Sequence, residues 1–234
     1  MPDVSGLSAS EPVEYEADLA ELIEDGRRLA ADGKRRILGL TGAPGAGKSQ
    51  LAAALVSALA PTAVLVPMDG FHLANAELVR LGRRDRKGAI DTFDAGGYVA
   101  LLRRLRDPAE DVVYAPEFRR DIEEPVACAI PVPRDVPLVV TEGNYLLVDT
   151  GPWAALGELI DEVWYLDPGD DVRVERLIAR HVAYGKPPDV ARAWSLGSDQ
   201  RNAELVSATR RRADRLIRLA SGELPVDTTP WPAA

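Results

Sequence analysis

The stretch LGLTGAPGAGKSQLAAAL, residues 38–55, says most about the fold. The pattern GxxxxGK[ST] occupies residues 42–49, directly after a short apolar run and directly before a segment rich in Ala and Leu. A strand that leads through a glycine-rich loop into a helix forms an anion site, because the loop amides and the N-terminal end of the helix point at the same place. The stretch therefore predicts an α/β fold that holds nucleotide phosphates.

The residues of this loop have separate chemical tasks. Glycine at positions 42, 45 and 47 lets the backbone curl with its N–H groups turned inward. Lys48 can reach the β- and γ-phosphates, and the Ser49 hydroxyl is a ligand for Mg²⁺. A chance glycine-rich turn is the alternative, but the order of strand, motif and helix argues against it. The expected nucleotide contacts are Gly42, Ala43, Pro44, Gly45, Ala46, Gly47, Lys48, Ser49 and Gln50.

The rest of the chain alternates between short apolar runs and segments with helical spacing. Continuous apolar runs of this length favour strands that are covered on both faces, as in a parallel sheet. The pattern predicts a three-layer α/β sandwich with a mostly parallel central sheet. A leading helix is expected at 16–32, and residues 111–133 are expected to form irregular strands or a hairpin. The candidate strands are 36–40, 62–68, 137–141, 162–166 and 215–219.

The chain length of 234 residues fits one domain with a small helical lid. Residues 1–15 are expected to be a disordered tail, 16–225 the domain, and 226–234 a second tail. Within the domain, we expect the lid at about 173–192 and an acceptor-site insertion at about 80–133.

Composition excludes several functional classes. The formal net charge of −9 argues against sequence-independent binding of nucleic acid, which needs excess Lys and Arg. A single cysteine, Cys128, excludes an intrachain disulfide and a Cys cluster for zinc, and so fits a reducing compartment. No stretch approaches the roughly 20 apolar residues that span a bilayer, and the N-terminus lacks the pattern of a signal peptide. We expect a cytoplasmic protein without membrane partners, and a homodimer is compatible with the sequence.

Two acidic residues stand where predicted strands end. VPMDGFHL (66–73) places Asp69 after one apolar run, and PLVVTEGNYLL (137–147) places Glu142 after another. Ligands collect beyond the carboxyl ends of parallel strands, so adjacent strands would bring both carboxylates to the bound γ-phosphate. Asp69 is expected to accept the proton of an attacking hydroxyl, and Glu142 to hold Mg²⁺ directly or through water. The alternative, a helix cap or a loop acid, is weaker for the two together. His72 could contact substrate or pack beside Phe71.

A second candidate group is cationic. Arg173, Arg176 and Arg180 are spaced by three and four residues, so they share one helix face that could close over phosphates. An ordinary solvated face is the alternative. YGKPP (184–188) is typical of a turn between lid helices. The basic run 80–90 favours a solvated loop over an anion site, and Asp94 could bond a substrate hydroxyl or cap the helix that starts near Gly97.

Six motifs, in their order along the chain, resemble those of the P-loop small-molecule kinases of the uridine kinase, phosphoribulokinase and pantothenate kinase superfamily. The resemblance covers about residues 34–220 and is strongest to the branch labelled fructokinase or fructose transport system kinase. The motifs are GAPGAGKS, PMDGFHL, GAIDTFD, YAPEFRRDIEEPVACAI, TEGNYLL and RLIARHVAYGKPPDVARAWSLGSDQRNAEL.

The resemblance implies an ATP- and Mg²⁺-dependent kinase with a small-molecule acceptor. It implies that Asp69 is the catalytic base, that Glu142 is the acid near Mg²⁺, and that lid arginines act with Lys48 on the phosphates. The implied lid residues are Arg176, Arg180 and Lys186, and the implied acceptor contacts are Asp94, Tyr114, Phe118 and Arg119. His72 is a further candidate acceptor contact from the residues alone. Uridine kinases commonly carry a histidine in the segment that corresponds to YAPEFRR, and this chain does not.

The expected reaction is in-line transfer of the γ-phosphoryl group of ATP to a hydroxyl of a small molecule, by positioning and charge rather than through a covalent intermediate. A sugar such as fructose or a nucleoside is the expected acceptor, and a pantothenate-like acceptor stays open. A nucleotide-sensing ATPase or GTPase switch is the rival from another class. The chain lacks the Asn-Lys-x-Asp guanine signature and the Leu-Ser-Gly-Gly stretch of transporter ATPases.

Overall fold

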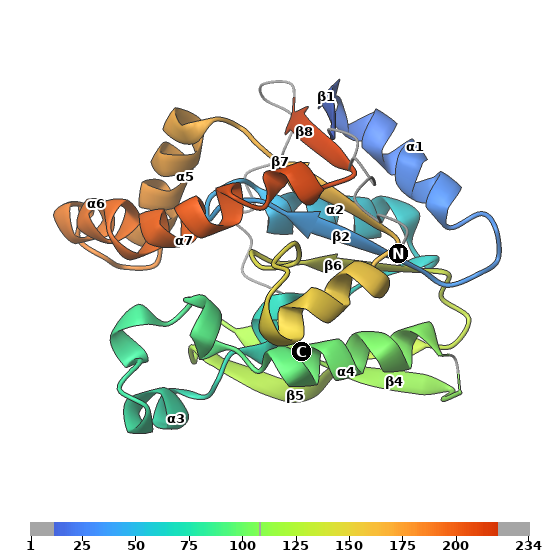
Figure 1. Ribbon diagram of the computed structural model, residues 1–234, viewed down its shortest axis with the longest axis horizontal. Coiled ribbons are helices and arrows are strands. Elements are labelled where there is room, and N and C mark those ends of the chain that lie inside the picture. The colour runs from blue at the N-terminus through green and yellow to red at the C-terminus, as the bar shows by residue number, and fades with distance from the viewer. Residues whose placement is uncertain (1–11, 108, 220–234) are drawn as a thin grey trace, which may run out of the picture.

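The computed structural model describes residues 12–107 and 109–219, which build a three-layer α/β sandwich (Figure 1). At its centre lies a six-stranded sheet in the order β1-β8-β7-β2-β6-β3, in which every neighbouring pair is parallel. This confirms the predicted fold class. The strands are β1 (Val13–Ala17), β2 (Arg36–Thr41), β3 (Ala63–Leu65), β6 (Leu138–Glu142), β7 (Glu162–Leu166) and β8 (Arg215–Leu219).

Four strands match the apolar runs to within one residue, and two depart from expectation. The expected disordered tail is wrong for residues 13–15, because they belong to β1, which pairs in parallel with β8 at the edge of the sheet. Strand β3 is shorter than the run 62–68, since Pro67 has no N–H to continue the ladder and the chain turns into a 3₁₀ helix at Met68. The remainder of the expected N-terminal tail, 1–11, and the expected C-terminal tail, 226–234, lie outside the described residues.

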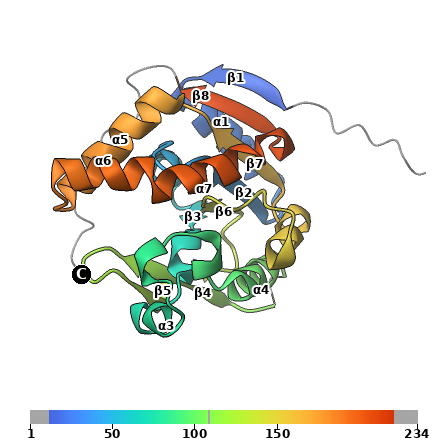
Figure 2. The ribbon, with the colours of Figure 1, turned by 60° about the vertical axis from the view of Figure 1, so that its left-hand side comes forward.

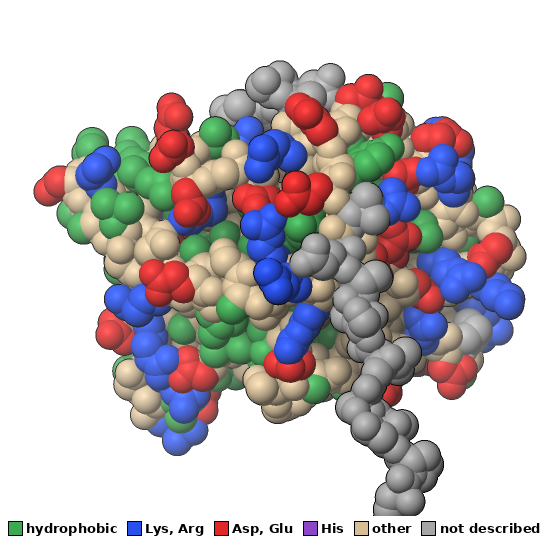
Figure 3. Space-filling view, turned by 45° about the horizontal axis from the view of Figure 1, so that its top comes forward, with side chains coloured by type: hydrophobic (Ala, Val, Ile, Leu, Met, Phe, Trp, Pro, Cys, Tyr) green, Lys and Arg blue, Asp and Glu red, His purple; other side chains and the backbone are tan. Residues whose placement is uncertain are grey.

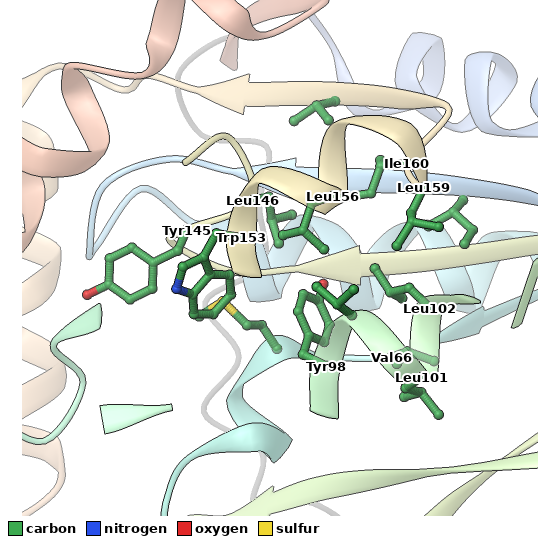
Figure 4. Close-up of a cluster of buried hydrophobic side chains, with 14 of the residues drawn as sticks. Val66, Tyr98, Leu101, Leu102, Tyr145, Leu146, Trp153, Leu156, Leu159 and Ile160 are labelled. Atoms are coloured by element: carbon green, nitrogen blue, oxygen red, sulfur yellow. The ribbon is translucent and has the colours of Figure 1, made fainter. Parts of the chain in front are cut away.

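Apolar side chains cover both faces of the sheet. Leu38 and Leu40 of β2 pack with helices α1 (Leu19–Leu29) and α2 (Lys48–Leu59) on one face. Ile37 of the same strand belongs to the cluster on the other face, beneath helix α4 (Ala95–Arg106) and the 3₁₀ helix η4 (Gly151–Glu158). In this second cluster Tyr98, Tyr145 and Trp153 gather beside aliphatic side chains of α4 and η4 (Figure 4). Burial on both faces explains the continuous apolar runs of the strands.

Two further units lie beyond the central sheet, the lid helices above and a hairpin unit below in the views of Figures 1 and 2. The lid contains α5 (Asp170–Ala183), α6 (Pro188–Leu196) and α7 (Ser198–Ser207). The hairpin unit contains α3 (Asn75–Arg80) and the antiparallel strands β4 (Val112–Arg119) and β5 (Glu124–Pro133), as expected for 111–133. Short 3₁₀ helices complete the connections: η1 (Met68–Phe71), η2 (Arg84–Arg86), η3 (Ile90–Thr92) and η5 (Arg210–Arg212).

The surface carries both signs of charge, and acidic and basic side chains are interspersed over the face in Figure 3. Exposed apolar side chains also occur on the lid, among them Tyr184 and Leu196. Within residues 12–107 and 109–219, no helix has the length and apolar character to cross a membrane.

Candidate active site

The loop between β2 and α2 has the geometry of a phosphate cradle. Gly42, Gly45 and Gly47 all have positive φ angles, of 147°, 87° and 98°. Gly47 is the N-cap of α2 and has no side chain to cap the helix, so the first amides of α2 remain available to an anion. The ammonium group of Lys48 lies inside this loop and donates to the carbonyl oxygens of Gly42 and Ala43 at 2.9 and 3.2 Å. Burial lowers the pKa of Lys48 to about 8.

Glu142 lies beside the loop because β6, which it ends, is the direct neighbour of β2. Leu40 of β2 is in register with Glu142, one residue before the end of β2. The Ser49 hydroxyl, at the start of α2, donates to Oε1 of Glu142 at 3.2 Å. Glu142 is 6% exposed, and its burial raises its pKa; the nearby charge of Asp69 acts in the same direction, while Lys48 opposes both.

Asp69 reaches the same edge from β3, the other neighbour of β6. Two glycines allow the close packing that places it there. A Cβ at position 143, directly after Glu142, would lie 2.6 Å from the Cβ of Met68. A Cβ at position 70, directly after Asp69, would collide with the carbonyl group of Pro116 in β4. The chain segments that carry the two carboxylates are therefore in direct contact, and the charge of Asp69 acts on both Glu142 and Lys48.

The Asp69 carboxylate lies beside the hairpin unit and is partly accessible to solvent. Its side chain is 32% exposed, with the guanidinium of Arg120 at 3.6 Å and Nδ1 of His72 at 3.9 Å. The His72 ring donates instead from Nδ1 to the backbone carbonyl of Asp69, at 2.8 Å. This ring lies against Phe93 and Phe118, with centroid distances of 4.0 and 4.8 Å.

The surroundings of His72 disfavour its protonated form. Burial lowers its pKa, the charge of Asp69 opposes this, and the positive charges of Lys87 and Arg120 add to the lowering. The imidazole contacts the Phe93 and Phe118 rings at tilted angles of 42° and 45°, and the three rings form an aromatic wall beside Asp69. The structure therefore brings His72 and Phe118, both predicted as acceptor contacts, to the same aromatic wall.

The side chains of three other predicted acceptor contacts have partners or orientations of their own, although the Asp94 amide donates to the carbonyl of Phe71, two residues after Asp69, at 2.8 Å. Asp94 is exposed and acts as the N-cap of α4, accepting from the amide of Gly97 at 2.8 Å. Tyr114 is 51% exposed, and because its neighbours in β4 are buried, its side chain lies on the outward face of the hairpin. Arg119 is exposed and makes two hydrogen bonds with the Asp121 carboxylate, at 2.9 and 2.7 Å. The expectation that these three residues contact an acceptor stays a prediction.

The three lid arginines have different roles. Arg180 is close enough to Lys48 and Asp69 for their charges to interact, so it belongs to the site. Arg176 and Arg180 are both exposed on α5, and the charge of Arg176 is not among those that act on Lys48 or Glu142. Arg173 is buried and connects the lid to the phosphate loop, since it donates to the carbonyl of Pro44 at 3.3 Å and to Oε1 of Gln200 at 2.7 Å.

Sequence reasoning did not single out two cationic residues, Arg120 near Asp69 and Lys87 near Phe118. Arg120 faces Asp69 where Arg119 had been expected. Lys87, from the basic run 80–90, lies 4.9 Å from the ring centre of Phe118 and donates to Oδ1 of Asn75 at 2.8 Å. Pro116 was an available signal for Arg120, because a proline inside a strand indicates a bulge that changes which side chains face inward.

Comparisons with known proteins agree with this geometry. No family model matches the chain. A protein of Schizosaccharomyces pombe that is provisionally named a uridine kinase is 34% identical over 174 residues, which cover 70% of this chain and 74% of that protein. An ATP-dependent kinase-like protein of Aspergillus versicolor is 34% identical over 146 residues, which cover 58% of this chain and 85% of the relative.

A solved structure from Silicibacter sp. TM1040, provisionally named a fructose transport system kinase, shares the fold with a TM-score of 0.77 and 36% identity. The match covers 86% of this chain and 98% of that one. The glycine loop, the acid that ends β6 and these relatives lead to one conclusion. The chain belongs to the P-loop kinases of the uridine kinase and pantothenate kinase type.

Proposed function

We propose that this protein transfers the γ-phosphoryl group of ATP to a hydroxyl group of a small molecule, with Mg²⁺ as cofactor. A sugar such as fructose or a nucleoside is the proposed acceptor class, and a pantothenate-like acceptor is the alternative. The observation that carries the proposal is the meeting of Lys48, Glu142 and Asp69 at the carboxyl ends of three neighbouring strands. A protein that only binds nucleotide has no need of a second, solvent-accessible carboxylate at this place.

Each residue has a role that follows from its position. The loop amides and Lys48 hold the β- and γ-phosphates, and Arg180 adds a second positive charge from the lid. Asp69 accepts the hydrogen of the acceptor hydroxyl and orients its oxygen toward the γ-phosphorus. Because the Asp69 side chain is 32% exposed, an acceptor can reach it from solvent. His72 and Phe118 form the wall against which the acceptor lies.

The residues beside the phosphate loop fit Mg²⁺. The Ser49 hydroxyl and the Glu142 carboxylate are oxygen donors only 3.2 Å apart, and oxygen ligands are those that Mg²⁺ prefers. In the described part of the chain, no cluster of three or more His, Cys, Asp or Glu residues could hold a metal ion by itself. At a nucleotide, Mg²⁺ is usually bound by one or two protein oxygens, and phosphate oxygens and water complete its coordination shell. When bound, the ion neutralises phosphate charge during transfer.

The experiment is product analysis. The full chain is incubated with Mg²⁺, ATP and one member at a time of a panel of sugars, nucleosides and vitamin precursors, and the products are followed by ³¹P NMR and mass spectrometry. The proposal predicts that one class of acceptor gains a phosphate on a hydroxyl, with one ADP formed per product. Reactions without acceptor, and with EDTA, are the controls.

Release of inorganic phosphate at a rate that no acceptor changes would contradict the proposal. That result would favour the rival, a nucleotide-sensing ATPase that acts by a change of shape. Guanine nucleotides belong in the same assay, because a preference for GTP without an acceptor would favour a GTPase switch.

A further inference from the structure

Arg120 lies between the base and the lid. Its guanidinium is 3.6 Å from Oδ2 of Asp69, and the ring of Tyr184, at the end of α5, lies 5.9 Å from its guanidinium carbon. The charge of Arg120 also acts on Arg180, Glu142 and His72. A group that interacts with the base, the lid and the hairpin wall at once borders the space an acceptor must occupy.

Among the described residues, the Arg120 guanidinium donates no hydrogen bond. At 3.6 Å its contact with Asp69 is an ion pair too long for a hydrogen bond, and it donates to no other side chain or carbonyl within residues 12–107 and 109–219. Arg119, its neighbour in sequence, differs in this respect, because its guanidinium forms a two-point pair with Asp121. The guanidinium N–H groups of Arg120 are therefore available to a ligand that reaches Asp69.

A second cation flanks the same wall. Lys87 lies over the face of Phe118, whose other neighbour is His72. The nearby Glu124 carboxylate accepts the amide of Asn75 with both oxygens at 3.0 Å, and the Glu123 backbone carbonyl accepts from Lys87. Burial lowers the pKa of Lys87, and the charges of Glu123 and Glu124 act in the opposite direction. Lys87 beside Phe118 and Arg120 beside Asp69 are two cationic side chains whose charges both act on His72, in a chain with a formal net charge of −9. Cationic side chains that border a site favour anions there.

We propose that the acceptor carries an anionic group, a carboxylate or a phosphate, and that Arg120 binds this group while Asp69 takes the hydrogen of the reacting hydroxyl. The inference rests on the proposed kinase function and changes its expected acceptor from a neutral sugar or nucleoside to a hydroxy acid, a sugar phosphate or a nucleotide. The planar guanidinium matches both anions in a two-point geometry, and Lys87 supplies the longer-range attraction. A neutral sugar or nucleoside would leave the guanidinium N–H groups of Arg120 without an anionic group to bind.

The test uses acceptor pairs that differ in the anionic group: glycerate and glycerol, pantothenate and panthenol, fructose 6-phosphate and fructose, UMP and uridine. Phosphoryl transfer to each is measured with the native chain and with the Arg120→Gln and Arg104→Gln variants. Arg104→Gln removes the same charge from an exposed residue of α4 that pairs with Glu110. We expect the anionic member of the active pair to be preferred by at least about tenfold in kcat/KM, and Arg120→Gln to lower kcat/KM for it by roughly 10- to 100-fold, mainly through KM. Arg104→Gln should stay within about twofold of the native chain.

Equal use of the two members of the active pair would overturn the inference while leaving the kinase function intact. A fall in kcat on Arg120→Gln that is equal for both members would also overturn it, because Arg120 would then act on the phosphoryl group. Binding supplies a readout that does not need turnover: with the loop filled by Mg²⁺ and a non-hydrolysable ATP analogue, the same pairs are titrated by ligand-observed NMR. Anion binding that Arg120→Gln removes supports the inference even if no acceptor turns over, a result that would count against the kinase function alone. If no anionic member binds the native chain, the inference is wrong.

Discussion

The Ser49 hydroxyl donates to Oε1 of Glu142 across 3.2 Å and so connects the helix that follows the phosphate loop to the strand beside it. This contact joins two segments that lie more than 90 residues apart in sequence, and it holds a carboxylate that is almost fully buried. Such a carboxylate is costly to ionise, so its position reflects a task in binding rather than a contribution to stability.

Replacing Glu142 with Gln should therefore raise stability and lower activity. The pKa of Glu142 is raised in the folded chain, so its contribution to stability is complete below its ordinary pKa of about 4.5 and is lost as the pH rises through the folded value. Glutamine has no charge, so Glu142→Gln removes the stability loss that ionisation of the buried carboxylate causes. We expect the free energy of unfolding at pH 7 to rise by about 1 kcal/mol in the absence of nucleotide. Urea denaturation at several pH values measures this free energy.

The same variant should need more Mg²⁺ for half-maximal turnover, because an amide is a weaker ligand than a carboxylate. Glu158→Gln makes the same chemical change at an exposed position and should alter neither property. A Glu142→Gln variant that is less stable than the native chain, with an unchanged Mg²⁺ requirement, would refute the interpretation of this site.

Nucleotide affinity should fall as the pH rises above about 8. Burial lowers the pKa of Lys48 to about 8, so the free protein loses this charge above that pH, while bound phosphates favour the protonated amine. Binding of ATP above pH 8 should then take up a proton, and the dissociation constant should rise by up to about tenfold per pH unit. Calorimetry in buffers of different ionisation enthalpy measures both effects. A dissociation constant that does not change between pH 7 and 10 would argue against a lowered pKa of Lys48.

Replacing Gly143 with Ala should move the Glu142 and Asp69 carboxylates apart. A Cβ there would lie 2.6 Å from the Cβ of Met68, and this backbone-near atom cannot move aside as a flexible side-chain end can. We expect Gly143→Ala to cost about 1–3 kcal/mol of stability and to lower kcat more than it changes ATP affinity. Gly157→Ala is the control, because a Cβ at position 157 meets no heavy atom within 4 Å. Native kcat in a folded Gly143→Ala variant would show that this packing does not position Asp69.

The sequence predicted the strands and the phosphate loop well because both have local signals. Continuous apolar runs mark strands buried on two faces, and the glycines of the loop mark backbone angles that other residues avoid. Strand β1 was missed because it lies at the sheet edge, where Glu14, Tyr15 and Glu16 stay exposed and show no apolar run. Its place depends on backbone pairing with β8, which is a distant part of the chain.

The acceptor side was harder to predict because it depends on a change of register. Ala115 pairs with Ile130 and Glu117 with Val126, so β5 has two more residues than β4 between these pairs, and the regular ladder is interrupted there. The buried Ala115 is odd-numbered, whereas Phe118, which contacts His72, and Arg120, which faces Asp69, are even-numbered. Regular alternation from Ala115 would have placed Arg119 inside and Arg120 outside. The irregularity in the hairpin thus coincides with the change in which of two adjacent arginines faces Asp69.

Asp69 is the residue on which the proposed chemistry depends, and its replacement by Asn gives the most direct test. The amide keeps the size of the side chain but cannot accept the hydroxyl hydrogen, so we expect phosphoryl transfer to the identified acceptor to fall by about 10²- to 10⁴-fold, with ATP affinity within about threefold of native. Asp85→Asn, the same change on the exposed basic loop, should leave both unchanged. Transfer at the native rate by Asp69→Asn would contradict the account.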